Sequence, residues 1–92
     1  MKLSELLKTE DQWTQHTNAR DRRGMKVDPL SENAVKWCLL GGFVKCFHNE
    51  ENARFKLLRL QDLTKKDITD FNDESTFEDV RALIEKFENE TQ

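Results

Sequence analysis

Cys38 is the residue of this chain best placed for chemistry. It lies within AVKWCLLGGFVKCF, the most apolar stretch of the 92 residues, near the start of a predicted helix. A thiol at a helix N-terminus can have a lowered pKa and act as a nucleophile. His16 or His48 would then serve as the base, and Asn72 or Asp73 would orient that base. Such a set of residues is compatible with a thiol-dependent enzyme.

The helix predicted over residues 32–47 argues against that chemistry. Ser31 is a good N-cap and Glu32 suits the first turn, so Cys38 would lie about two turns inside the helix. The helix dipole has little effect at that depth. A cysteine with apolar neighbours on both sides packs as a small apolar side chain. We therefore expect no catalytic residue and a protein that is not an enzyme.

The pair Cys46-x-His48, taken with His16 and Cys38, is the only pattern that suggests a zinc site. Structural zinc sites hold four converging ligands, usually in tight pairs such as C-x2-C. Here only one tight pair exists, and Cys38 is two helical turns away. The two cysteines are too far apart for a disulfide, since they lie about 12 Å apart along a helix. We expect no metal, no cofactor and two free thiols, as in a reducing compartment.

Length and composition predict one mainly helical domain over residues 1–92. Hydrophobic residues make up 36% of the chain and charged residues 36%, so the core is thin and depends on six Phe and two Trp. One Pro and three Gly favour helices over a many-turned β fold. We expect a compact bundle of four to five short helices around a buried central helix, residues 32–47, with a small β-hairpin near residues 18–27.

The spacing of apolar residues predicts two further helices. The first has a stripe at intervals of four, three and three residues, formed by Ala53, Leu57, Leu60 and Leu63. The second has intervals of three, four and three, formed by Phe77, Val80, Ile84 and Phe87. Thr76 and Asp79 resemble a capping box at the start of this last helix.

Gly41 and Gly42 lie in the middle of the predicted central helix. Each costs about 1 kcal/mol against alanine in a helix interior. That cost is tolerable where a neighbouring backbone must approach closely. The glycine pair therefore predicts tight packing against another segment.

Charge is unevenly distributed along the chain. Residues 1–66 carry a net charge of +4 and residues 67–92 a net charge of −7, which gives −3 in total. The loop over residues 20–26 is predicted to be an exposed basic turn with four cations, Arg20, Arg22, Arg23 and Lys26. The acidic part offers a second candidate surface, formed by Asp70, Asp73, Glu74 and Glu78. Unequal charge of this kind is often found in proteins that dock on a partner, and a solvated helix face explains the acidic end equally well.

Nucleic-acid binding through residues 20–26 is an alternative, because Lys and Arg neutralise phosphates. However, the chain is acidic overall and has no aromatic residues interleaved with these cations. It also has no helix-turn-helix or RNA-module signature. A solvated loop or an acidic protein partner fits the basic residues better.

Four segments occur together in an order that resembles a family of small uncharacterised proteins from bacteria and their phages. They are LLKTEDQW, ARDRRGMKVDP, AVKWCLLGG and FNDESTFEDVRALIEKF. The family is marked by a Trp-Cys-x-x-Gly-Ala core helix and a Trp-Asn-Asp loop before a Thr-capped C-terminal helix. Here Gly42 replaces the usual Ala and Phe71 replaces a frequent Trp, and both exchanges keep a packing role. The resemblance implies a shared fold and a phage or bacterial origin, and it supplies no activity.

These observations favour a small, non-enzymatic interaction protein, encoded by a phage or prophage, that binds and modulates a bacterial host protein such as an enzyme or a defence system. The N-terminal residues contain no apolar run of signal-peptide length, and no stretch approaches the length of a membrane span. We therefore expect a cytoplasmic protein with no membrane contact. The sequence makes no prediction of oligomeric state.

Overall fold

Five α-helices, one short 3-10 helix and two short strands make up the computed structural model, which describes residues 1–91. The elements in chain order are α1 (Leu3–Leu6), η1 (Glu10–Gln12), β1 (Ala19–Arg20), β2 (Lys36–Trp37), α2 (Leu39–Phe47), α3 (Ala53–Thr64), α4 (Ile68–Glu74) and α5 (Phe77–Thr91). The mainly helical fold predicted from composition is confirmed. None of the helices within residues 1–91 is long and apolar enough to span a bilayer.

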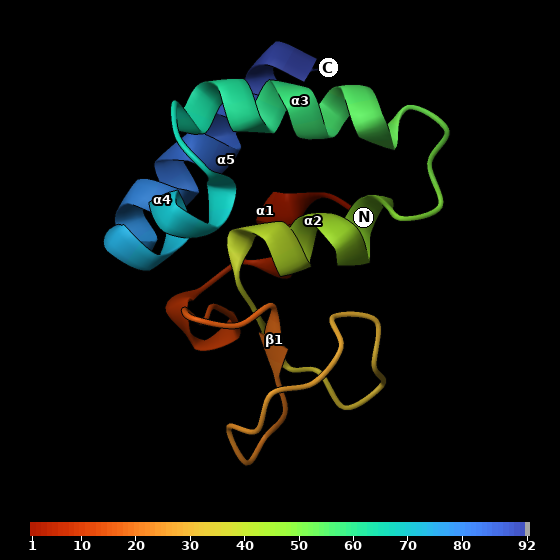
Figure 1. Ribbon diagram of the computed structural model, residues 1–92, viewed down its shortest axis with the longest axis vertical. Coiled ribbons are helices and arrows are strands. Elements are labelled where there is room, and N and C mark those ends of the chain that lie inside the picture. Colours follow the sequence, from red (N-terminus) through yellow and green to blue (C-terminus); the bar gives the residue numbers. More distant parts are fainter. Residues whose placement is uncertain (92) are drawn as a thin grey trace.

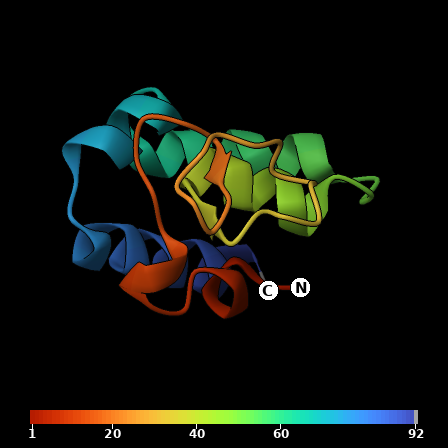
Figure 2. The same cartoon turned by 90° about the horizontal axis from the view of Figure 1, so that it is seen from below.

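The helices form two layers, which Figure 2 shows edge-on. One layer holds α2 and α3, and the other holds α1 and α5. Helix α1 contacts both α2 and α5, while α3 contacts α4 and α5. The two strands and their loops extend from the helical body at the lower end of Figure 1. The loops that flank the two strands are therefore carried at one end of a helical frame.

The core is drawn from every helix except the 3-10 turn. Its largest fully buried apolar side chains are Phe87, Leu3, Leu7, Leu39, Leu60, Ile84 and Val80. Both predicted stripes face this core, because Leu60 on α3 and Val80 and Ile84 on α5 are fully buried. The capping box of α5 is also confirmed. Thr76 Oγ1 accepts a hydrogen bond from Asp79 N (3.2 Å), and Asp79 Oδ2 accepts one from Thr76 N (3.4 Å).

The first and last helices are joined through polar groups as well as apolar ones. The Arg81 guanidinium on α5 donates hydrogen bonds to the carbonyl oxygens of Ser4 (2.9 Å) and Leu7 (3.1 Å) at the end of α1. Glu88 Oε2 accepts a hydrogen bond from Ser4 N (3.0 Å). Both ends of a one-turn helix, whose backbone groups lack partners within the helix, are therefore satisfied by α5.

The central helix is shorter than predicted. It begins at Leu39, not at residue 32, because Lys36 and Trp37 form strand β2. The backbone of β2 and of the preceding residue, Val35, forms hydrogen bonds with other segments. Val35 N donates to Arg20 O (2.9 Å), and Trp37 O accepts from Thr14 N (3.1 Å). These non-local hydrogen bonds hold the backbone in an extended conformation where the local sequence predicts a helix.

The predicted hairpin over residues 18–27 is only partly correct. The chain does turn back there, since Arg20 and Lys26 form an antiparallel bridge and Val27 N donates to Ala19 O (3.1 Å). The regular antiparallel pair, however, joins β1 to β2, with Ala19 opposite Trp37 and Arg20 opposite Lys36. The loop 20–26 is therefore held by a sheet whose other strand, β2, lies outside the predicted hairpin.

The two glycines of α2 have different neighbours. A Cβ atom on Gly41 would lie 1.9 Å from the carbonyl oxygen of Asn18, which is backbone and cannot turn aside. A Cβ atom on Gly42 would lie 3.3 Å from the ends of the Leu3 and Leu7 side chains. The close backbone approach predicted from the glycine pair is confirmed at Gly41.

This difference predicts opposite sensitivities to alanine. Gly41→Ala should lower the free energy of unfolding by at least about 2 kcal/mol, because overpacking against a fixed backbone outweighs the gain in helix propensity. Gly42→Ala should remain within about 1 kcal/mol of the wild type, because the leucine ends can move and alanine favours the helix. Urea unfolding of both variants checks this. Equal losses at the two positions would contradict the geometry.

Candidate functional site

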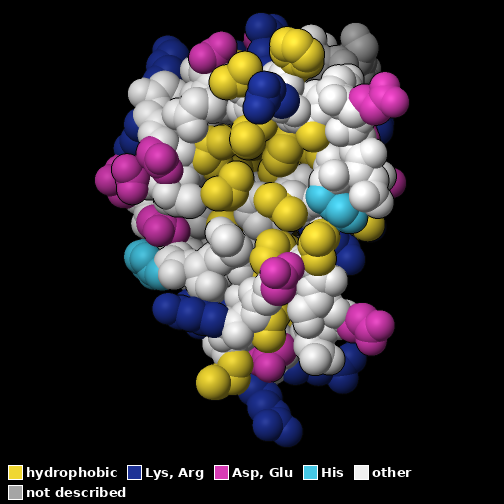
Figure 3. Space-filling model, turned by 45° about the vertical axis from the view of Figure 1, so that its right-hand side comes forward, with side chains coloured by type: hydrophobic (Ala, Val, Ile, Leu, Met, Phe, Trp, Pro, Cys, Tyr) yellow, Lys and Arg dark blue, Asp and Glu magenta, His cyan; other side chains and the backbone are white. Residues whose placement is uncertain are grey.

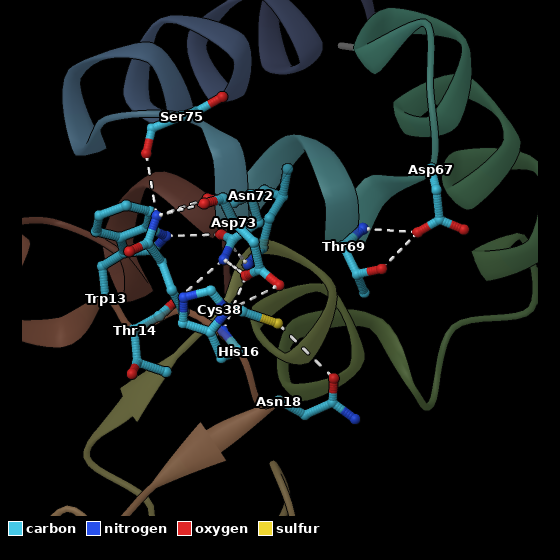
Figure 4. A network of polar contacts seen from close by, with 12 residues as sticks. Trp13, Thr14, His16, Asn18, Cys38, Asp67, Thr69, Asn72, Asp73 and Ser75 are labelled. Carbon is cyan, nitrogen blue, oxygen red and sulfur yellow. Dashed lines mark hydrogen bonds and ion pairs between the residues drawn. The ribbon is translucent and has the colours of Figure 1, made fainter.

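Asn72 is the centre of a polar network between α4, α2 and the segment after η1 (Figure 4). Its side chain is fully buried. The carbonyl oxygen Oδ1 accepts two hydrogen bonds, one from the Trp13 indole Nε1 (2.7 Å) and one from Leu39 N (3.0 Å). The amide Nδ2 donates to Thr14 O and to Asp73 Oδ1, both at 3.1 Å. All of its hydrogen-bonding capacity is used to hold other segments in place.

The neighbouring polar side chains complete the end of α4. Gln15 Nε2 lies within hydrogen-bonding distance of three carbonyl oxygens there, on Asn72, Asp73 and Ser75, at 3.1 to 3.2 Å. Carbonyl groups in the last turn of a helix have no partner within the helix, so Gln15 supplies one. The family resemblance implies that Asn72 and Asp73 lie in a loop, but both belong to the last turn of α4.

Asp73 holds the chain at His16. Its Oδ1 accepts a hydrogen bond from His16 N (2.9 Å), and its Oδ2 lies 3.5 Å from His16 Nδ1. His16 has a left-handed backbone, with φ of 70°, which is uncommon for a residue other than glycine. The carboxylate thus stabilises a tight turn just before β1, and the imidazole itself is exposed.

Cys38 is the N-cap of α2, which corrects its predicted position two turns inside a helix. Its sulfur accepts a hydrogen bond from Gly41 N (3.3 Å) and lies 3.7 Å from Asn18 Oδ1. The residue is only 3% exposed. Burial raises the pKa of the Cys38 thiol, against the opposing effect of the backbone N–H groups at the helix start. The sulfur therefore serves as a cap in place of the usual Ser or Asp.

A hollow of about 300 Å³ lies beside this thiol. It is lined by His16, Thr17, Asn18, Cys38, Thr69 and Asp73. The sulfur makes its hydrogen bonds within residues 1–91 to Asn18 and Gly41, and none to an imidazole. His48, the other candidate base, lies at the opposite end of α2, where its Nδ1 is 3.1 Å from Val44 O. The hollow thus brings together Cys38, His16 and Asp73 without forming an activated nucleophile.

Cys46 and His48 do not form part of a metal site in the described residues. No group of three or more His, Cys, Asp and Glu side chains in residues 1–91 is arranged to hold an ion. Both cysteines are free thiols, as the sequence predicts. Burial raises the pKa of the half-buried Cys46 to about 11.

The four cations of loop 20–26 have two different roles. Arg20 is an internal clamp: its guanidinium donates to Thr14 Oγ1 (2.8 Å), Gly24 O (2.8 Å) and Gln15 O (3.3 Å). The other three, Arg22, Arg23 and Lys26, are exposed. Within residues 1–91, the side chains of these three cations are engaged in no ion pair or hydrogen bond. We name Arg22, Arg23 and Lys26 the basic tip.

The four predicted acidic residues are likewise divided. Asp70 and Glu78 are exposed on α4 and α5. Glu74 forms an ion pair with Lys66, and Asp73 is committed to His16 and Asn72. The acidic residues therefore do not form one free surface, and Asp73 is part of the framework.

The role of Asn72 was not predicted from the sequence, although one signal was present. Asn72 follows Ile68 by four residues, so the two share a helix face, and Ile68 points into the core. A lone amide on a buried face must find partners for both ends of its side chain. The partners themselves come from residues 13–14 and 39, which no local pattern connects to α4.

Truncation of Asn72 tests its role as the centre of the network. Asn72→Ala should lower the free energy of unfolding by about 3 kcal/mol, because it leaves the Leu39 N–H and the Trp13 indole N–H without an acceptor. Asn33→Ala, which removes an exposed amide, should change it by less than about 0.5 kcal/mol. Denaturant unfolding followed by tryptophan fluorescence measures both. A loss below about 1 kcal/mol at Asn72 would contradict the assigned role.

The raised thiol pKa values predict low reactivity and sensitivity to alkali. At pH 8 the native protein should react with Ellman's reagent at least about tenfold more slowly than the unfolded chain, because the thiolate is the reactive form. The Cys46→Ser variant leaves Cys38 as the only thiol that can react. Rapid reaction of Cys38 at pH 7 would contradict its role as a buried cap.

The raised pKa of Cys46 also predicts sensitivity to alkali. Since this pKa rises from 9.0 to about 11 on folding, the unfolded chain loses the proton first, and the free energy of unfolding should fall as pH rises above about 9. Urea unfolding of the wild type and the Cys46→Ser variant at pH 8 and pH 10 measures this loss.

Comparison with known proteins places this chain in a family. The chain matches no curated protein, and it matches no solved structure. Residues 2–90 match the model of a family described as "Family of unknown function (DUF6197)". The match covers the helical frame, the basic tip and the Asn72 network together. The chain belongs to the DUF6197 family.

Proposed function

We propose that this protein is a non-enzymatic interaction protein, encoded by a phage or prophage, whose basic tip binds an acidic surface of a bacterial host protein and modulates it. The observation that supports this proposal is the rigid presentation of three unpaired cations at one end of the molecule, within the described residues. The tip lies on the loop at the lower end of Figure 1, and Lys and Arg side chains are visible at the same end in Figure 3.

The loop is held in shape by residues beneath the tip. Asp21 Oδ1 accepts hydrogen bonds from Arg23 N (2.9 Å) and Met25 N (3.0 Å), and Gly24 provides a positive φ of 82°. The Arg20 clamp fixes the other side through Gly24 O. A surface that is already ordered loses less entropy on binding than a flexible one. The loop 20–26 is thus preorganised to present its charges.

The surroundings of the tip favour a protein partner over nucleic acid. Met25 lies between these cations in the loop and is 62% exposed, so an apolar side chain stands among them. A hollow of about 530 Å³ lies beside Arg22 and Arg23, and Asp21 and Glu32 contribute to its lining. Carboxylates repel a phosphate backbone, whereas a mixed apolar and charged surface is typical of protein interfaces.

The thiol enzyme is less well supported. Cys38 is buried, caps α2 and has a raised pKa, whereas a nucleophilic thiol needs a lowered pKa and access to substrate. No described base contacts its sulfur. These properties support a structural role for the cysteine and leave the surface as the place of function.

A matched pair of charge reversals tests the proposal. Tagged wild-type protein and the Arg22→Glu/Arg23→Glu variant are used to capture proteins from nuclease-treated bacterial lysate, with bound proteins identified by mass spectrometry. The control is Lys8→Glu/Lys86→Glu, which makes the same change in net charge at exposed positions elsewhere. We expect one host protein in near-equal amount with wild type and control, and a loss of at least about tenfold with the tip variant.

A second assay separates the two kinds of partner. Binding to a fluorescent 20-base-pair DNA duplex should be absent at about 150 mM salt. Binding that falls steeply with salt and disappears in the tip variant would assign the loop to nucleic acid instead. A captured protein that is retained equally by the tip variant and the control would exclude the basic tip as its binding surface.

A further inference from the structure

The outer face of α3 carries the most exposed large aromatic side chain of the described residues. Phe55 is 74% exposed and Leu58 is 56% exposed. They lie three residues apart on the same side of the helix, while Leu60 and Thr64 face the core. Helix α3 runs along the upper edge of the molecule in Figure 1, away from the basic tip. This face is separate from the surface of the proposed function.

The charged residues around Leu58 follow a self-complementary order. Counting outward from Leu58, Arg54 lies four residues before it and Asp62 four residues after it. Glu51 lies seven residues before it and Lys65 seven residues after it. Arg54, Leu58 and Asp62 lie four residues apart within α3, so they share one face of the helix. Glu51 precedes the N-cap Asn52 and Lys65 is the left-handed C-cap, so these two charges flank the helix at its ends. Each position before Leu58 therefore has a residue of opposite charge at the equivalent position after it.

All four of these charged residues are available to a partner. Each is exposed, and within residues 1–91 none of their side chains forms an ion pair or a hydrogen bond. Other charges nearby are already paired within the chain: Glu50 with Lys56, Arg59 with Glu90, and Lys66 with Glu74. The fold therefore leaves these four charges unpaired among the described residues.

We propose that the α3 face binds a second copy of this chain, with the two α3 helices antiparallel and crossing at Leu58. In that arrangement Arg54 of one copy faces Asp62 of the other, because each lies four residues from Leu58 within α3. The two-fold axis repeats this contact, so the dimer has two ion pairs. Leu58 packs against Leu58 of the second copy, and Phe55 covers this contact. A parallel pairing would instead place each charge beside its own kind, which is unfavourable.

The size of the face sets the strength of this dimer. Stable interfaces bury about 800 Å² on each partner, and one face of a three-turn helix provides less. Exposed ion pairs contribute little each and are screened by salt. We therefore expect a reversible dimer that forms at high protein concentration and dissociates as salt rises. The inference does not depend on the proposed function, because neither apolar residue belongs to the basic tip.

A charge-swap experiment tests the pairing directly. Sedimentation equilibrium of the wild type at 25 mM salt should show a monomer–dimer equilibrium. Arg54→Asp places two acidic pairs across the interface, and Asp62→Arg places two basic pairs there. Each variant alone should dimerise at least about tenfold more weakly than the wild type. An equimolar mixture of the two should form a 1:1 heterodimer, since positions 54 and 62 are then both acidic in one copy and both basic in the other.

Matched controls keep the result specific. Arg22→Asp and Glu32→Arg make the same two changes in charge on exposed residues of the loops at the opposite end of the molecule, and both should dimerise like the wild type. Circular dichroism confirms that all variants are folded. A wild type that stays monomeric up to about 1 mM would overturn the proposal. So would single variants that dimerise as strongly as the controls, or a mixture of them that does not associate.

Discussion

The carboxamide of Asn72 is the interaction on which the rest of the structure depends. Four hydrogen bonds join one fully buried side chain to Trp13, Thr14, Leu39 and Asp73. A buried amide is stabilising only when both its donor and its acceptor are satisfied, so the partners can occupy only a narrow range of positions. This requirement sets where α2 starts, because the Leu39 N–H must reach Oδ1. The apolar core supplies most of the stability, and the amide selects one arrangement of it.

The loop that carries the basic tip is tied to this framework through a short series of residues. Asn72 bonds Thr14 O, and the hydroxyl of the same Thr14 accepts from the Arg20 guanidinium, which also bonds Gly24 O. The arginines of this loop therefore have different roles. Arg20 stabilises the loop through hydrogen bonds, whereas Arg22 and Arg23 are exposed on it. The separation between framework and surface explains how a thin core can still present rigid charges.

The sequence predicts the amphipathic helices well, because their information is local. The stripes of α3 and α5 and the Thr76–Asp79 cap follow from residues that are neighbours along the chain. The start of α2 and the role of Asn72 cannot be predicted from neighbouring residues, because both depend on contacts between distant segments. Residues 32–37 were predicted as helix from Ser31 and their apolar content, yet the backbone of Arg20 and Thr14 pairs with this region instead. Of the eight candidate site residues, the sequence cannot separate Arg20 and Asp73, which hold the fold, and Glu74, which pairs with Lys66, from the five that are unpaired among the described residues.

The contacts between α1 and α5 have a consequence for the order in which the chain assembles. Arg81 and Glu88 satisfy the backbone of Ser4 and Leu7, and the Leu3 and Leu7 side chains cover Gly42. Helix α1 can therefore dock only after α5 has been synthesised. Until then α2 has one uncovered face, and the loop to be closed spans most of the chain, which slows the search for the native contacts. Folding of this domain is thus completed when α5 docks on α1.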